Sequence, residues 1–231
     1  MQRYNNMTLR EWQKEYKPVR ELIVNASSTD KNDSWREWPI GMGYNYARMF
    51  EEDQRSFVPN DDVARSFQIG NHNKTILCSF WPESDYARRN ACTINRRTIL
   101  GNLNTNGTYN SPLFPRDYLN ELLNHKFVAS PEGQGFDCHR HYEALIAGSI
   151  PVVERNALIE DKYKNMPILY TKDYSEITDK YLLKAYGDII DKRYDFSKLF
   201  LSYYDHASQN DIKRSGNFWI HRLAKKNWYH A

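Results

Sequence analysis

Several features common in other protein classes are scarce in this sequence. Only three cysteines occur, Cys78, Cys92 and Cys138. An odd number without paired metal-ligand spacing argues against a disulfide framework and favours a reducing compartment. No run of about 18 apolar residues exists, and the first 17 residues lack the apolar core of a signal peptide. The sequence therefore predicts an intracellular, cytoplasmic protein without a transmembrane segment.

An excess of charge of one sign is also missing. The 231 residues include 32 basic and 29 acidic side chains, which gives a net charge of +3. A polybasic surface that binds nucleic acid through counterion release is therefore not expected, and the short basic-aromatic stretches do not change this. We predict no nucleic-acid partner, and an anionic small molecule fits the charge better.

Signatures of several enzyme classes are absent as well. Ser130 does not lie in a G-x-S-x-G elbow, which weakens a hydrolase interpretation. No D-x-D follows an apolar strand, since Asp61 and Asp62 lie in a loop. On a helix, His139 and His141 would point roughly 200° apart and would rarely share one ion. We therefore predict no metal site and no cofactor apart from a donor substrate.

Segments of strand length alternate with helical segments from Lys74 onward. This alternation predicts an α/β fold, a doubly wound and mostly parallel sheet with helices on both faces. Residues 1–73 are treated as a reduced or incomplete N-terminal domain, loop-rich from 25 to 73, with a capping-box helix at 8–16. Residues 74–231 form the sheet domain with C-terminal helices. The expected strands are 74–80, 126–130, 149–154 and 166–170, and the expected helices are 86–100, 115–126, 138–147, 157–165, 174–191 and the remainder at 195–226.

The polar loop of residues 130–138, between two apolar runs, is the main candidate for a binding site. It follows a strand, and ligands of open α/β sheets bind at the carboxyl ends of strands. Gly133 and Gly135 permit a tight turn, and the next helix would offer free N–H groups to a phosphate. Arg140 could add a bidentate contact to the same anion. Alternatively, the loop is an ordinary βα connection, and Arg140 with Glu143 is a surface pair.

The stretch "FVASPEGQGFDCHRHYEALIAGSIPVVE" resembles the signature of the C-terminal, nucleotide-sugar-binding domain of exostosin-like glycosyltransferases. It is more distantly similar to a segment of α-1,3-fucosyltransferases. The resemblance implies a GT-B architecture, in which two Rossmann-like domains face each other and no metal is usually needed. The matching residues are Glu132, Gly133, Arg140, Glu143, Ala144, Leu145, Gly148, Ile150 and Pro151.

The resemblance also implies roles for individual residues. Arg140 would hold the donor diphosphate, Glu143 the nucleoside, and Glu132 would face the transferred sugar. A weaker likeness extends over residues 74–191 and implies that Arg88, Arg96 or Arg97 approaches the diphosphate. Asp137 is an alternative catalytic carboxylate, and His139 in the first helical turn could donate to phosphate. The candidate donor-binding set is Arg96, Arg97, Gly133, Gly135, His139, Arg140 and Glu143.

These observations predict an inverting, metal-independent glycosyltransferase. It would move a sugar from a UDP- or GDP-linked donor to a hydroxyl of a glycan acceptor. The alternative is a nucleotide- or glycan-binding module without catalysis. Residues 1–70 are too short for a complete N-terminal Rossmann domain, so further domains of a longer polypeptide are potential partners. The aromatic residues Trp35, Trp38, Tyr44 and Tyr46 are expected on the acceptor side.

Overall fold

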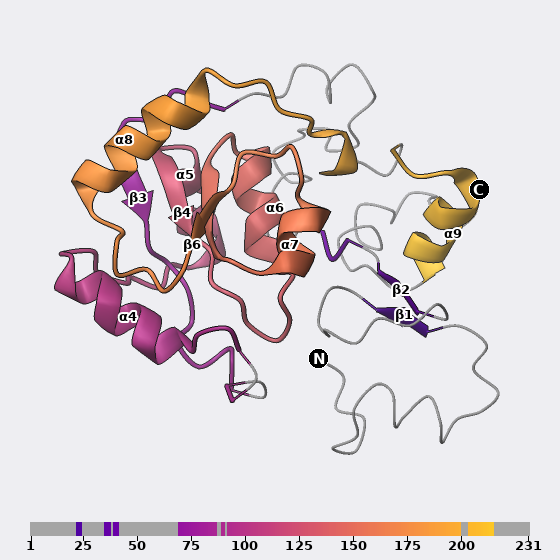
Figure 1. Cartoon of the computed structure of the whole chain (residues 1–231), viewed down its shortest axis with the longest axis horizontal. Helices are drawn as coiled ribbons and strands as arrows, with labels where there is room; N and C mark the ends of the chain where they lie inside the picture. The colour runs from indigo at the N-terminus through magenta and orange to yellow at the C-terminus, as the bar shows by residue number, and fades with distance from the viewer. Residues whose placement is uncertain are drawn as a thin grey trace.

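The computed structural model describes residues 22–24, 35–37, 39–41, 69–86, 89–90, 92–199 and 203–214. Within them, a parallel sheet lies between two layers of helices (Figure 1). This arrangement confirms the predicted α/β class and is compatible with a Rossmann-like fold. Several predictions fall outside the described residues, namely the helix at 8–16, residues 215–226, and Arg88, Trp38, Tyr44 and Tyr46.

The sheet contains four strands, and all neighbouring pairs are parallel. Their order follows the chain, β3-β4-β5-β6, and the central register pairs Phe127 with Ile150. Strand β5 is buried along its whole length, as expected for a strand covered on both faces. The strands are β3 (Lys74–Leu77), β4 (His125–Ala129), β5 (Ile150–Glu154) and β6 (Leu169–Thr171).

Alternate residues of each strand enter two separate cores. Val128 and Val153 pack with α5 (Pro115–Leu122), α6 (His139–Ile146) and α7 (Ala157–Lys162) on one face. A strand order that always advances in one direction places such crossover helices on the same face, because the crossovers are right-handed. The helix predictions for these segments are confirmed, with Pro115 in the first turn of α5.

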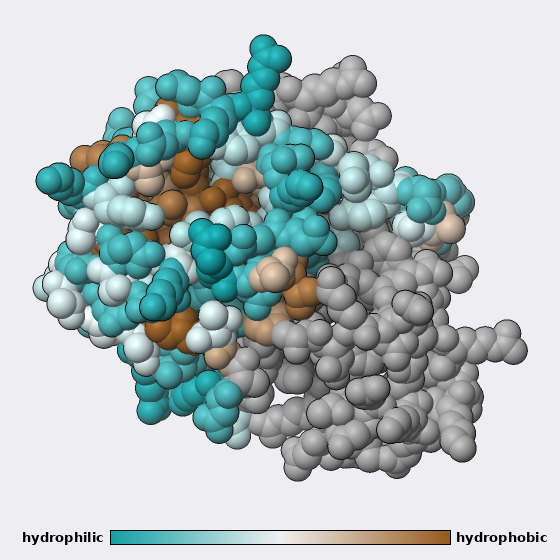
Figure 2. Space-filling model, in the orientation of Figure 1, coloured by the Kyte–Doolittle hydropathy of each residue, from teal (hydrophilic) through white to brown (hydrophobic). Residues whose placement is uncertain are grey.

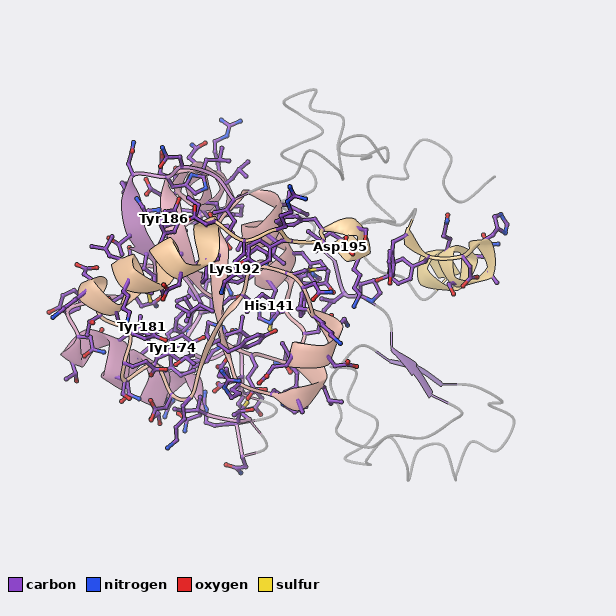
Figure 3. The ribbon with its side chains drawn as sticks, turned by 45° about the horizontal axis from the view of Figure 1, so that its top comes forward. His141, Tyr174, Tyr181, Tyr186, Lys192 and Asp195 are labelled. Atoms are coloured by element: carbon purple, nitrogen blue, oxygen red, sulfur yellow. The ribbon has the colours of Figure 1, made fainter. Side chains whose placement is uncertain are left out.

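The opposite face of the sheet is covered by α4 (Arg96–Thr105) and α8 (Asp179–Ile190). Phe127 and Val152 belong to this second core. Tyr181 and Tyr186 of α8 are partly buried against it, and both are labelled in Figure 3. Helices therefore cover both faces, as the alternating pattern predicts.

Helix α4 is displaced from its predicted position at 86–100. Residues 81–86 form turns instead, in which Ser84 N–H donates to the carbonyl of Trp81 and Tyr86 N–H to that of Glu83. The helix starts after Asn95, whose side chain accepts the Thr98 N–H. The capping bond fixes the start of α4 ten residues later than predicted.

Short elements lie outside the four-stranded sheet, two before it and two after it in the sequence. Strands β1 (Leu22–Val24) and β2 (Trp35–Glu37) form a separate parallel pair, and β2 falls in a segment predicted to be loop. After α8 come a 3-10 turn (Ser197–Leu199) and α9 (His206–Arg214). The C-terminal helical prediction is thus confirmed in part.

The outer surfaces of α7 and α8 are mainly hydrophilic (Figure 2). Hydrophobic residues show between these two helices, over the edge strand β6. In the part of the chain that the structure describes, no helix has the length and apolar character needed to span a membrane.

Candidate functional site

The loop after β4 is held in a compact turn at the carboxyl end of the sheet. Ser130 N–H donates to the carbonyl of Val152, which keeps the start of the loop beside β5. Gly133 N–H then donates to the carbonyl of Gly135 at 3.1 Å. The loop therefore lies where the sequence predicts it, at the sheet edge that binds ligands in this class of fold.

Arg96, the first residue of α4, joins this loop to the segment after β3. Its Nε donates to the carbonyl of Glu132 at 2.8 Å and its Nη2 to that of Pro131 at 2.7 Å. Nη1 donates to the carbonyl of Trp81 at 2.9 Å and to Ser84 Oγ. These acceptors are neutral, and burial lowers the pKa of the guanidinium. Arg96 thus fixes the relative position of two loops, and its contact with a donor stays a prediction.

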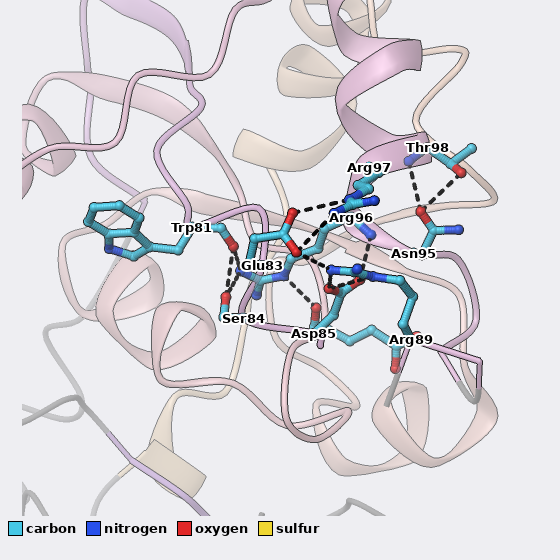
Figure 4. Close-up of polar contacts among 10 residues, drawn as sticks. Trp81, Glu83, Ser84, Asp85, Arg89, Asn95, Arg96, Arg97 and Thr98 are labelled. Atoms are coloured by element: carbon cyan, nitrogen blue, oxygen red, sulfur yellow. Dashed lines mark hydrogen bonds and ion pairs between the residues drawn. The ribbon is translucent and has the colours of Figure 1, made fainter. Parts of the chain in front are cut away.

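Arg97 points away from this loop and toward the protein surface. Its guanidinium contacts both carboxylate oxygens of Glu83, at 3.1 and 3.3 Å. Glu83 also pairs with Arg89, which in turn contacts the buried carboxylate of Asp85 at 2.8 Å (Figure 4). The structure therefore does not bring Arg97 together with Arg96 at the loop after β4.

Two buried carboxylates meet at the ends of β4 and β5. The Glu132 N–H lies 3.2 and 3.1 Å from the two carboxylate oxygens of Glu154, and each side chain is 2% exposed. Burial and the nearby Glu132 carboxylate raise the pKa of Glu154 to about 8. The Tyr174 hydroxyl lies 3.5 Å from Glu154 Oε2, and the Glu132 carboxylate accepts the Thr93 N–H. Glu154 ends an otherwise apolar strand, and this position was the signal for it in the sequence. The resemblance to glycosyltransferases did not single out Glu154.

Arg140 lies on the second position of α6, against α5. Its guanidinium carbon is 5.5 Å from the centre of the Tyr118 ring. Burial opposes the charge, but Tyr118 and Glu143 outweigh it, so the pKa of Arg140 is raised above its ordinary value. The Nε–H of Arg140 is buried and has no hydrogen-bond partner. Arg140 is partly exposed, and it packs against the buried side chains of Tyr118 and Glu143, unlike an ordinary surface pair.

The N-terminus of α6, like that of α5, lacks the side-chain cap found on α4, α7 and α8. Those three helices have side-chain caps from Asn95, Asn156 and Thr178, respectively. The N-cap of α6 is Cys138, whose side chain makes no capping hydrogen bond. Its thiol instead lies 3.6 Å from the carbonyls of Pro131 and Gly135, and burial raises its pKa to about 12. The first turn of α6 thus keeps backbone donors that no side chain caps.

Asp137 is the centre of a buried hydrogen-bond network. Its carboxylate accepts from the Tyr163 hydroxyl at 2.6 Å and the Tyr142 hydroxyl at 3.0 Å. Lys162 Nζ lies 2.6 Å away, and the Ile40 N–H donates at 3.1 Å. Burial would raise the pKa of Asp137, but Lys162 and the hydroxyl donors hold it below its usual value. These contacts tie Asp137 to the protein interior, and its catalytic role stays a prediction.

The two histidines of α6 contact different parts of the protein. His139 Nδ1 donates to the carbonyl of Gly41 at 2.6 Å, so Nε2 could donate to an anion only in the charged ring. His141 is fully buried between Phe136 and Ser130. Its Nε2 donates to the Phe136 carbonyl, so Nδ1 accepts from the Ser130 hydroxyl at 2.6 Å. Burial lowers the pKa of His141 to about 4. The two rings are thus separated, as the helical spacing predicts.

No group of three or more His, Cys, Asp or Glu side chains that could hold a metal ion occurs among the described residues. The carboxyl edge of the sheet instead combines a glycine loop, the buried Arg96, the partly buried Arg140 and two buried glutamates. Burial lowers the pKa of Arg96, and the charge of Arg140 adds to this effect. Such an edge has donors for an anion and carboxylates beside them.

Comparison with known families agrees with this arrangement. No curated protein sequence matches the chain significantly. The profile of the RXYLT1 C-terminal domain matches residues 69–210, which is more than half of the chain and includes the whole four-stranded sheet. The resemblance to glycosyltransferases in the sequence is thereby confirmed at the level of the family. The chain belongs to the RXYLT1 C-terminal domain family, a family of glycosyltransferases.

Proposed function

We propose that the protein transfers a sugar from a UDP- or GDP-linked donor to a hydroxyl of a glycan. The family match over residues 69–210 carries this proposal. The transferred sugar would be a hexose, a pentose or a deoxyhexose. We extend the proposal to the GT-B architecture and to a metal-independent reaction with inversion at the anomeric carbon.

The donor diphosphate would bind at the N-terminus of α6. This assignment is supported by a first helical turn without a side-chain cap and by the buried, unpartnered Nε–H of Arg140. The partial positive charge of a helix N-terminus and a guanidinium both favour a diphosphate. Glu143, which lies with Arg140 and Tyr118 in one cluster, would face the nucleoside.

In the proposed reaction, the acceptor oxygen attacks the anomeric carbon as the bond between that carbon and the diphosphate oxygen breaks. The nucleoside diphosphate leaves with the electron pair, and the acceptor proton passes to a base that we leave unassigned. The developing negative charge would be stabilised by Arg140 and the α6 N–H groups. The Glu132 carboxylate already accepts the Thr93 N–H and is almost fully buried, which fits orientation of the donor sugar better than proton removal.

Calorimetric titration with UDP and with GDP tests the donor site. Arg140→Ala should weaken binding of the preferred nucleotide by about 1.5–3 kcal/mol, the range for a hydrogen bond to a charged group. Arg140→Lys should recover part of this loss, since it keeps the charge without the fork of donors. Arg193→Ala is the control, because this exposed residue follows α8 and is far from α6 in sequence. Unchanged affinity in a folded Arg140→Ala variant would remove the assignment.

Transfer itself is tested by nucleoside diphosphate release from a panel of UDP- and GDP-sugars with oligosaccharide acceptors. We expect acceptor-dependent release that persists with excess EDTA. A strict requirement for Mn²⁺ or Mg²⁺ would contradict the metal-independent reaction. Nucleotide binding without release on any donor would favour a binding module.

A further inference from the structure

Exposed aromatic side chains are concentrated beside the candidate donor site. Among the described residues, seven large hydrophobic side chains are exposed, and four of them lie between β3 and α5. Trp81 is 67% exposed and Tyr109 is 73% exposed. The other two of the four are Tyr86 and Phe114. Exposed apolar side chains that gather in one region of a protein often mark a binding surface.

The segments that carry Trp81 and Tyr109 are fastened together. The side chain of Asn110 accepts the Phe80 N–H at 3.0 Å and donates to the Phe80 carbonyl at 3.0 Å. The Leu113 N–H donates to Ser79 Oγ, and the Ser111 N–H to the Cys78 carbonyl. Trp81 and Tyr109 are the chain neighbours of the doubly bonded pair, Phe80 and Asn110. Their backbones are therefore held beside each other before any ligand binds.

Trp81 is also close to the loop that would face the donor sugar. A single guanidinium, that of Arg96, bonds to the carbonyls of Trp81 and Glu132 at 2.9 and 2.8 Å. The indole projects away from the Arg96 contacts (Figure 4). The backbone of Trp81 is thus joined to the Glu132 loop through one guanidinium, while its exposed ring projects outward.

The charged side chains of the Glu83 to Arg97 cluster next to Trp81 are paired with one another. Glu83 pairs with Arg89 and Arg97, and Asp85 pairs with Arg89. Among the described residues of this cluster, two guanidinium groups pair with two carboxylates, while the third guanidinium, that of Arg96, is buried and donates to neutral acceptors. In the part of the chain that the structure describes, the surface beside the indole therefore presents paired charges only, which suits an uncharged, hydroxyl-rich ligand better than a phosphorylated one.

We propose that Trp81 and Tyr109 form a subsite for a neutral sugar ring of the acceptor glycan. One face of a pyranose ring presents C–H groups that pack on an aromatic ring, while the hydroxyl groups at its rim remain in water. Aromatic rings provide such contact area at a low cost in conformational entropy, and the backbones that carry these two rings are held together by the Asn110–Phe80 bonds. The inference rests on the proposed function for its acceptor, because it places the sugar ring beside the donor loop.

The test is direct binding of neutral oligosaccharides, independent of sugar transfer. The probes are xylo-, manno-, cello- and N-acetylchito-tetraose, measured by saturation-transfer NMR and calorimetry. Trp81→Ala should weaken the best ligand about tenfold, or about 1.4 kcal/mol. Trp81→Phe should keep most of the affinity, and Tyr109→Ala should show a smaller loss. The control, Leu183→Ala, removes a 55% exposed side chain on α8 and should have no effect.

Folding is not expected to confound the comparison, because Trp81 bonds to Arg96 through its backbone carbonyl, which the variant keeps. The proposal is overturned if no tetraose binds, if Trp81→Ala binds equally well, or if that variant instead loses affinity for UDP or GDP. The last outcome would place the indole against the nucleotide. Tetraose binding that depends on Trp81 in a protein without transferase activity would support the subsite while removing the proposed function.

Discussion

At the scale of single residues, the packing of Gly133 against Arg96 matters for the loop after β4. A Cβ atom at position 133 would lie 3.0 Å from Arg96 Nη2. The guanidinium cannot easily move, because it donates to three carbonyls and a hydroxyl. Gly133 is therefore required for the close approach of the two loops.

Gly133→Ala should lower the free energy of unfolding by about 1–3 kcal/mol, the usual cost of overpacking a close contact. Urea denaturation measures this change. Gly101→Ala is the matched control, since a Cβ at Gly101 meets nothing within 4 Å in the middle of α4. It should stabilise the protein by about 0.5–1 kcal/mol. Equal stability of Gly133→Ala and the parent protein would show that Arg96 is free to shift.

The sequence indicates single residues well only where a motif or a spacing identifies them. Arg140 and the glycine loop could be found in this way. The roles of Arg96 and Glu154 could not, because they depend on contacts between positions 36 and 22 residues apart. By residue type alone, Arg96 and Arg97 were equal candidates for contact with the donor diphosphate. In the structure, α4 directs Arg96 inward and Arg97 to the surface.

At the scale of elements, α4 depends on its N-terminal caps. Asn95 Oδ1 accepts the Thr98 N–H at 3.0 Å, and Asp85 Oδ2 accepts the Arg96 N–H at 2.9 Å. These two bonds occupy the helix end that the positive partial charge would otherwise offer to an anion. The contrast with α6 follows from this difference in capping.

Asn95→Ala should destabilise the protein by about 1 kcal/mol, the typical cost of losing an N-cap. Asn95→Asp is the control, since a carboxylate also accepts the Thr98 N–H and interacts favourably with the helix dipole. Its stability should equal or exceed that of the parent protein in thermal unfolding. If Asn95→Ala is as stable as the parent protein, the hydrogen bond to Asp85 alone defines the start of α4.

Element prediction from the sequence succeeded where hydrophobic pattern and terminal residues agree. Pro115 marks the start of α5, and Gly148 with a φ of 76° follows the end of α6. The predicted start of α4 was wrong. Residues 86–95 are compatible with a helix by residue type, but their conformation depends on side-chain contacts that residue type does not reveal. The buried carboxylate of Asp85 bonds to Arg89 and to the Arg96 N–H, and the described residues of this segment form turns and bends before the helix.

At the scale of the whole molecule, different buried titratable groups make the stability depend on pH in opposite directions. Glu154 has a pKa of about 8 in the folded protein against 4.5 ordinarily, so the folded state holds an extra proton between these values. Stability from this group falls as pH rises through that range. His141 has a pKa of about 4 against 6.5, so the unfolded state holds the extra proton between 4 and 6.5. Stability from His141 therefore rises with pH in that window.

Between about pH 4.5 and 6.5 the effects of Glu154 and His141 on stability cancel. Burial lowers the pKa of His125, which adds a small rise in stability with pH. Below this range stability should fall, since the pKa values of Asp85 and Asp137 are held below the ordinary value despite their burial. Above pH 6.5 the Glu154 effect is unopposed. The parent protein should lose about 2 kcal/mol between pH 6.5 and 8, or 1.5 pH units at about 1.36 kcal/mol each.

Glu154→Gln should remove this loss. The amide oxygen can still accept the Glu132 N–H, but the side chain no longer ionises, so stability should rise up to pH 6.5 and then stay constant to pH 8. Chemical denaturation at half-unit pH steps measures both curves. Glu160→Gln is the control, because this carboxylate pairs with Arg155 near the surface and should leave the decline above pH 6.5 in place. A decline that persists in Glu154→Gln would mean that a group other than Glu154 holds the extra proton.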